Sequence, residues 1–86
     1  MAKYKITVTK TAEKTLFRLP KEIIPKIIAA IQALADNPYP SGCRKLSGHE
    51  NIFRIRVQTY RIIYEVVKDT IEIIVLKVGH RKDVYR

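Results

Sequence analysis

The chain has 86 residues, enough for a single domain over residues 1–86. Lysine and arginine total 17 against 8 acidic residues, so the formal net charge is +9, and a hydrophobic content of 47% excludes a disordered polycation. A lone cysteine excludes an internal disulfide and a cysteine-based metal site, and no apolar run approaches the ~18 residues of a membrane span. We expect a basic, cytoplasmic domain whose partner is a polyanion, with nucleic acid favoured over an acidic protein or a merely solvated surface.

The first expected elements are a strand and two helices. Apolar and polar residues alternate over 3–9, which is the period of a half-buried strand. Thr9 is suited to cap the helix that follows, and Pro20 ends that helix. A second helix is expected within 21–36, where isoleucines recur at helical spacing. Pro25 fits only the first turn of this helix, so we expect it to start late.

A loop and three strands complete the expected fold. The loop covers 37–50, which holds two prolines and two glycines and is long enough to be functional. Strand patterns follow over 51–57, 60–67 and 71–78. The tail after them shows no helical or strand-like periodicity of apolar residues. The sequence therefore predicts an α+β fold in the order β-α-α-β-β-β, with a helical hairpin packed on one face of an antiparallel sheet.

The most informative pattern is a set of arginines on the first two strands of the expected meander. If residues 58–59 form a two-residue turn, Arg56 lies directly opposite Arg61, and Arg54 shares their face. The other face is apolar and suits a core against the helices; it carries Phe53, Ile55, Val57, Tyr60, Ile62 and Tyr64. Like charges placed directly opposite destabilise a sheet, so stability alone would favour a carboxylate or a threonine at one of these positions.

The arginine face is interpreted as an anion site, because the planar guanidinium fork matches phosphate. The alternative is that Glu65 and nearby acids neutralise the cluster, or that the side chains splay into water. Arg44 and Lys45 in the loop are interpreted as additional phosphate contacts. The tail adds groups that move protons or hold phosphate: His80, Arg81, Lys82 and Tyr85. A terminal charge run is also typical of a solvated chain end.

These residues give the chain a family resemblance. It resembles the RelE/ParE superfamily of toxins from prokaryotic toxin–antitoxin pairs, and within it the RelE-type ribosome-dependent mRNA endonucleases. The matching segments span nearly the whole chain: Leu19–Ile23, Asn37–Pro38, Gly42, Lys45–Leu46, Gly48, Phe53–Val57, Tyr60–Glu65 and Gly79–Arg86. No single segment is specific, whereas their order and spacing together are.

The resemblance implies a RelE-like fold of the microbial ribonuclease type and a toxin that inhibits translation by cleaving mRNA in the ribosomal A site. In that reaction the ribose 2′-OH attacks the adjacent phosphate and leaves a 2′,3′-cyclic phosphate and a 5′-OH, with no metal and no other cofactor. The implied partners are a cognate antitoxin protein, the ribosome and mRNA. Operator DNA would be met only through the toxin–antitoxin complex, and no membrane is involved.

The resemblance also implies roles for individual residues. The basic residues of the family's first two meander strands align with Arg54, Arg56 and Arg61. We expect these three to clamp phosphate and to stabilise the extra negative charge of the transition state. The tail arginine and tyrosine of the family align with Arg81 and Tyr85. Arg81 would hold the scissile phosphate or the leaving oxygen, and Tyr85 would stack on a base or assist proton transfer.

One departure from the family concerns the general base. Some members carry lysine where this chain has Arg54 and Arg56, and lysine there is assigned as the base. Arginine stays protonated and cannot take that role. His80, which titrates near neutrality, is therefore the candidate base or acid, beside Tyr85.

Three other functions stay open at this point. The runner-up is a ParE-type gyrase inhibitor, which shares the fold but binds a protein target and has no nuclease site. The arginine set argues against it, because an inhibitor that only binds protein needs no phosphate site. The others are a nucleic-acid-binding domain without chemistry and a degenerate, inactive toxin.

Overall fold

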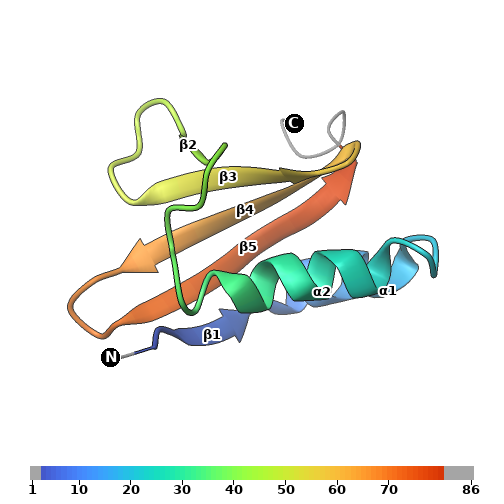
Figure 1. The fold of residues 1–86 in the computed structure, drawn as a ribbon, viewed down its shortest axis with the longest axis horizontal. Coiled ribbons are helices and arrows are strands. Elements are labelled where there is room, and N and C mark those ends of the chain that lie inside the picture. The colour runs from blue at the N-terminus through green and yellow to red at the C-terminus, as the bar shows by residue number, and fades with distance from the viewer. Residues whose placement is uncertain (1–2, 81–86) are drawn as a thin grey trace.

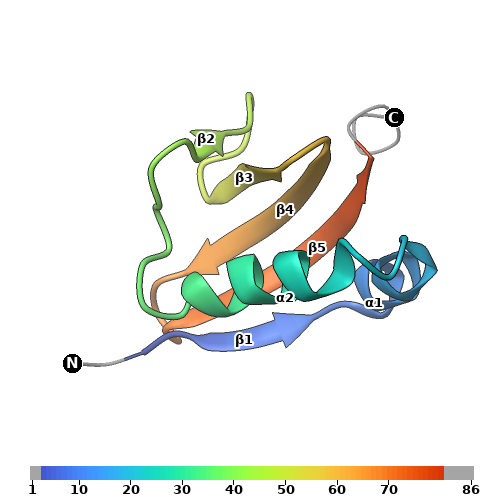
Figure 2. The ribbon, with the colours of Figure 1, turned by 45° about the vertical axis from the view of Figure 1, so that its right-hand side comes forward.

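The structure, a computed structural model, describes residues 3–80 of the chain (Figure 1). Within these residues the elements are β1 Lys5–Val8, α1 Lys10–Arg18, α2 Ile24–Ala33, β2 Arg44–Lys45, β3 Ile52–Val57, β4 Tyr60–Val67 and β5 Glu72–His80. The strands form one sheet, and Figures 1 and 2 show both helices on the same side of it. The expected α+β fold, with a helical hairpin on one face of the sheet, is confirmed.

The strand order of the sheet is β1-β5-β4-β3-β2. Neighbouring strands are antiparallel except at the β1 edge, where Lys5 to Val8 pair in parallel with Glu72 to Val75. The expected antiparallel sheet therefore gains one parallel pair. A parallel pair needs a long connection, and here both helices and the other strands lie between β1 and β5.

Local chemistry explains where both helices begin. Thr9 has an extended backbone, and its side-chain oxygen accepts a hydrogen bond of 3.1 Å from the Ala12 N–H, which confirms the expected cap. Helix α2 begins at Ile24, with Pro25 in its first turn, which confirms the late start. No helix within residues 3–80 is long and apolar enough to cross a membrane.

The core lies between the helices and the sheet. Its buried side chains include Ala12, Leu16, Ile23, Ile27, Ile31, Leu34, Ile55, Ile62, Tyr64, Val66, Ile73, Val75 and Val78. Tyr64 is fully buried, and its hydroxyl donates a 2.7 Å hydrogen bond to the Pro38 carbonyl, which ties the segment after α2 to the sheet. Burial raises the pKa of the Tyr64 phenol, and the neighbouring Cys43 thiol raises it further.

The segment after α2 contains a strand that the sequence did not indicate. Arg44 and Lys45 lie in the expected loop, yet they form the short strand β2, paired with Arg54 and Phe53 of β3. These two residue pairs give β3 a neighbouring strand on the edge that faces away from β4, over part of the length of β3. Positions 44 and 45 are therefore fixed on the sheet.

Strand β5 is longer than the sequence indicated. The expectation that the last strand ends at residue 78 is wrong, because β5 runs to His80. Gly79 and His80 continue the ladder, opposite Arg61 and Tyr60 of β4. The extension arises because β4 begins directly after the hairpin turn, so its first residues are available to pair with β5.

Candidate functional site

The β3–β4 hairpin places two arginines side by side. Its register pairs Arg56 with Arg61 and Val57 with Tyr60, which confirms the two-residue turn over 58–59. Directly opposite residues of an antiparallel pair point to the same face, with Cβ atoms ~4.5–5.5 Å apart. The expected apolar face is confirmed as well, since all six of its residues lie in the core or pack against it: Phe53, Ile55, Val57, Tyr60, Ile62 and Tyr64.

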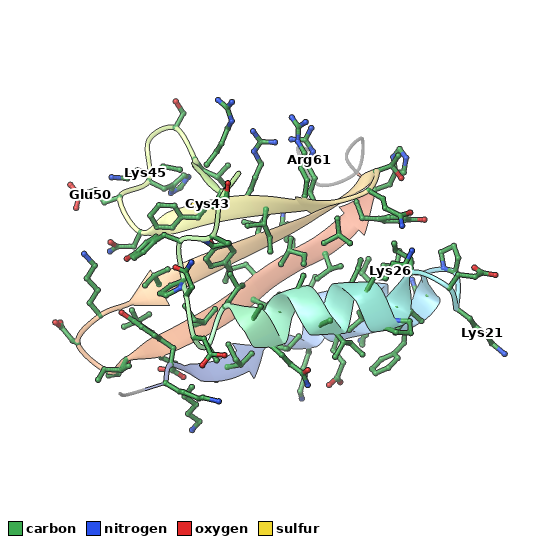
Figure 3. All side chains as sticks on the ribbon, viewed as in Figure 1. Lys21, Lys26, Cys43, Lys45, Glu50 and Arg61 are labelled. Atoms are coloured by element: carbon green, nitrogen blue, oxygen red, sulfur yellow. The ribbon has the colours of Figure 1, made fainter. Side chains whose placement is uncertain are left out.

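The two arginines occupy the sheet face opposite the helices. In Figure 3 the Arg61 side chain rises from the sheet on the side away from α1 and α2. Arg61 is only 8% exposed, whereas Arg56 is exposed. We call Arg56 and Arg61 the first row.

A second row of basic residues lies two positions away along β3. Arg54 is opposite Arg44 of β2 on one side and Ile63 of β4 on the other, and Ile63 is opposite Lys77 of β5. Arg44, Arg54 and Lys77 therefore share the outer face with the first row, and we call them the second row. At ~3.3 Å per strand residue the rows are roughly 6.6 Å apart, a spacing comparable to that of successive phosphates along an extended RNA strand.

Arg54 gives the second row an unused donor. Among residues 3–80, the Nη1 atom of Arg54 is buried and has no hydrogen-bond partner. Glu65 is a diagonal neighbour of Arg54 across the hairpin, yet no ion pair joins these two described residues. Neutralisation by Glu65, one alternative drawn from the sequence, therefore does not extend to Arg54. A buried charged donor without an acceptor is unfavourable, so the second row is suited to an incoming anion.

Lys77 joins this face because of a β-bulge. Strict alternation from the buried Val75 would point Lys77 into the core, where a lysine is unfavourable. The bulge makes Leu76 an extra residue opposite β4, so the side chains after it exchange faces. Sequence reasoning missed Lys77, although the break in apolar alternation at Lys77, followed by the buried Val78, is a signal for such an insertion.

His80 lies on the other face of the sheet. It is opposite Tyr60, on the helix side, and the two ring centroids are 5.8 Å apart in an edge-to-face arrangement. Both residues line a cavity of about 390 Å³ beside α1. The structure therefore does not bring His80 together with the two rows. The other tail residues of the expected site, Arg81, Lys82 and Tyr85, lie outside the described residues.

Lys45 is also separated from the rows. It is opposite Phe53, whose side chain packs against the core, and neighbouring strand residues point to opposite faces. Of the two basic residues expected to contact RNA in this segment, only Arg44 shares the outer face with the arginines.

This arrangement can bind and stabilise negative charge. Guanidinium groups stay protonated and offer forked donors that match phosphate. The sheet fixes the backbone positions from which these side chains extend. Within residues 3–80, no group of three or more His, Cys, Asp or Glu side chains is arranged to hold a metal ion. The described basic residues are suited to an electrostatic role, and proton transfer requires a group beyond the arginines.

The fold and this site define a small basic α+β protein with cationic side chains gathered on one sheet face. Over residues 6–85 the sequence matches the family described as the ParE toxin of type II toxin–antitoxin system, parDE. The chain belongs to the RelE/ParE toxin superfamily and is a RelE-like toxin of a type II toxin–antitoxin system.

Individual relatives match along nearly their whole length. Toxin RelG of Mycobacterium tuberculosis is 32% identical over 87 residues, covering 96% of this chain and 97% of the relative. Toxin RelE3 of Methanocaldococcus jannaschii is 36% identical over 85 residues, covering 94% of each. Among solved structures, the RelE–RelB complex of Pyrococcus horikoshii matches with a TM-score of 0.82 and 28% identity, covering 95% of this chain and 99% of that one. The RelBE2 toxin–antitoxin complex of M. tuberculosis matches with a TM-score of 0.81 and 27% identity, covering 96% and 97%.

Proposed function

We propose that this chain is a metal-independent endoribonuclease that cleaves mRNA in the ribosomal A site and so inhibits translation. The observation that carries the proposal is the Arg56–Arg61 pair, two like charges held directly opposite each other on the sheet. Two forked cations held side by side on a rigid sheet offer an anion donors from both strands. RNA phosphate is the anion that matches the forked donors and the spacing of the two rows.

In the proposed reaction the ribose 2′-OH attacks the adjacent phosphate, and the 5′ oxygen of the next nucleotide leaves. The five-coordinate transition state carries more negative charge than the substrate. The first-row guanidinium groups stabilise that charge. Stabilisation of developing charge by preorganised donors is usually the largest single contribution to an enzyme's rate enhancement. The second row holds the neighbouring phosphate and so fixes the strand relative to the first row.

Proton transfer is assigned to the tail. Arginine cannot accept the 2′-OH proton. Of the two candidate groups, His80 faces the helix side of the sheet, so we assign Tyr85 ahead of His80 as the acid that donates its phenol proton to the leaving 5′ oxygen. The 2′-OH proton passes to water or to a group on the ribosome. Following the family resemblance, Arg81 holds the scissile phosphate or the leaving oxygen, and Lys82 contacts RNA.

A cognate antitoxin is the proposed protein partner. Similar solved structures include toxin–antitoxin complexes, which supports this partner. An acidic, partly disordered antitoxin segment would order on binding and cover the basic face or displace the tail. A cavity of about 490 Å³ between α2 and β3 suits an apolar side chain flanked by carboxylates, because Ala30, Ala33 and Ile55 line it together with Arg44 and Arg56. Operator DNA would be bound only through the toxin–antitoxin complex.

Gyrase inhibition is the second candidate, since the matching family bears the ParE name. One experiment separates the two. The chain is induced in cells, mRNA 5′ ends are mapped, and the supercoiling of a plasmid is measured in the same cultures. New 5′-OH ends inside translated regions, absent when an Arg61→Gln variant is induced, support the nuclease. Changed supercoiling without new ends supports the gyrase inhibitor, and neither change supports a binding domain or an inactive toxin.

A further inference from the structure

Helix α1 carries a second basic surface that the proposed nuclease site does not use. Lys10, Lys14 and Arg18 follow one another at four-residue spacing, and Phe17 lies three residues after Lys14, so all four lie on one side of the helix. The opposite side of α1 is buried in the core. Phe17 is 65% exposed, the highest value among the exposed large hydrophobic side chains of residues 3–80. We call these four residues the α1 stripe.

The stability of α1 does not explain the stripe. Lys10 with Lys14, and Lys14 with Arg18, are like-charge pairs four residues apart, which destabilise a helix. Lys10 also lies at the helix N-terminus, where the dipole disfavours a cation, and only Arg18 in the last turn suits it. Phe17 exposes its ring to water instead of adding to the core. A charged and aromatic ligand would offset all three effects.

The α1 stripe and the arginine rows face opposite sides of the molecule. Figures 1 and 2 show α1 on the helix side of the sheet, and its core side packs toward β5. The stripe therefore points away from the sheet, whereas Arg61 rises from the far face in Figure 3. Ligands bound at the stripe and at the rows do not compete for space.

RNA is the polyanion that fits the α1 stripe best. Three cations along one helix face match backbone phosphates, and an exposed phenyl ring is the platform on which an unpaired base stacks. A membrane fits less well, because an interfacial helix needs a broad apolar face. The other apolar side chains of α1, Ala12 and Leu16, are buried in the core.

We propose that the α1 stripe binds a structured RNA at an unpaired base, which stacks on Phe17 while Lys10, Lys14 and Arg18 contact the flanking phosphates. The proposal rests on the proposed function for its choice of RNA, but it requires no nuclease activity. The stripe would hold the protein on one RNA element while the two rows engage the strand to be cleaved.

The charge part of the proposal is tested by the salt dependence of binding. The full chain, made by cell-free synthesis, is titrated with a labelled RNA hairpin that has an unpaired loop, at several salt concentrations. The stripe variant is Lys10→Gln/Lys14→Gln/Arg18→Gln. The control Lys3→Gln/Lys5→Gln/Lys68→Gln removes the same formal charge from exposed positions on other elements. Glutamine is a good helix former, and circular dichroism checks that each variant is folded.

The stripe variant should bind the RNA hairpin more weakly, and its affinity should depend less steeply on salt concentration. Each lost phosphate contact lowers the slope of log affinity against log salt by about 0.7–0.9, so the slope should fall by about 2–3. The control should keep most of the slope. Equal losses in the stripe variant and the control would overturn the proposal, because only net charge would then matter.

Phe17→Ala tests the stacking part. Loss of one stacked base should weaken binding to the looped hairpin by roughly 5- to 150-fold and leave the salt slope unchanged. Binding to a fully paired duplex of the same length should not change, and undiminished binding of Phe17→Ala to the looped hairpin would overturn the proposal.

Two further readouts separate other partners and the nuclease proposal itself. If the stripe variant keeps its RNA affinity but loses binding to phosphatidylserine vesicles or to polyglutamate, the stripe serves a membrane or an acidic protein and the proposal is wrong. Cleavage of ribosome-bound mRNA is measured on the same samples. Absence of cleavage by the unaltered chain, with stripe-dependent RNA binding intact, would contradict the nuclease and support the stripe.

Discussion

Removing the Arg56 charge from the Arg56–Arg61 pair should lower activity without lowering stability. Arg56→Gln keeps a long polar side chain and removes one of two cations that lie directly opposite each other. A like-charge contact across a sheet destabilises by about 0.2–1 kcal/mol. Because Arg56 is exposed, water screens the contact, and the free energy of unfolding should rise by about 0.5 kcal/mol at most.

Cleavage should change in the opposite direction. A preorganised donor that faces developing charge contributes about 2.7–4 kcal/mol, so the single-turnover rate of Arg56→Gln should fall by about 10²–10³-fold. Arg56→Lys keeps the charge but loses the fork and should lie in between. Arg61→Gln should lose a similar amount of activity. Its stability should fall as well, because the Arg61 side chain is only 8% exposed and its stem contributes packing.

The assay pairs two measurements on each variant. Single-turnover cleavage is followed on ribosomes programmed with mRNA, and stability is read from urea unfolding. Lys68→Gln is the matched control, since it removes an exposed cation from the turn after β4 and should change neither quantity. A folded Arg56→Gln/Arg61→Gln variant that cleaves at the normal rate would refute the anion site. Unfolding of Arg56→Gln would refute the view that the pair opposes stability.

Other expected outcomes concern the core, the tail and the partner. Tyr64→Phe leaves the Pro38 carbonyl without its buried donor, which should cost about 1–3 kcal/mol and lower Tm by at least about 4 °C. Because burial raises the pKa of Tyr64, the unaltered protein should lose stability as pH rises above the ordinary tyrosine pKa of about 10, and equal alkaline profiles of the two proteins would contradict this. Tyr85→Phe should slow single-turnover cleavage by about 10²–10⁴-fold, whereas His80→Gln should have little effect; a pH–rate profile that flattens in His80→Gln would make His80 the base. Deletion of residues 81–86 should abolish cleavage yet leave a folded domain, which circular dichroism checks, since all the buried core side chains of the described residues lie between Ala12 and Val78. Expression of the chain alone should arrest growth, and co-expression of the neighbouring open reading frame should relieve it; harmless accumulation of the folded chain would argue against the toxin.

The sequence alone determined the features that depend on neighbouring residues. A threonine before a helical pattern predicted the cap at Thr9, and a proline in the first turn predicted the late start of α2. The two-residue turn over 58–59 determined the register of β3 on β4, and with it the Arg56–Arg61 pair. These predictions succeed because capping and hairpin register are set within a few residues of chain.

Only the tertiary structure decided which basic and titratable groups share a face beyond that hairpin. Lys77 reaches the arginine face through a bulge that strict alternation does not anticipate, and the extension of β5 along β4 places His80 on the helix side. Arg44 joins the second row because a segment expected to be a loop pairs with β3, while the same pairing turns Lys45 away. In each case the face of a side chain is set by the register of its strand against a partner distant in sequence. A shift of one residue in that register exchanges the two faces, so local pattern cannot fix it.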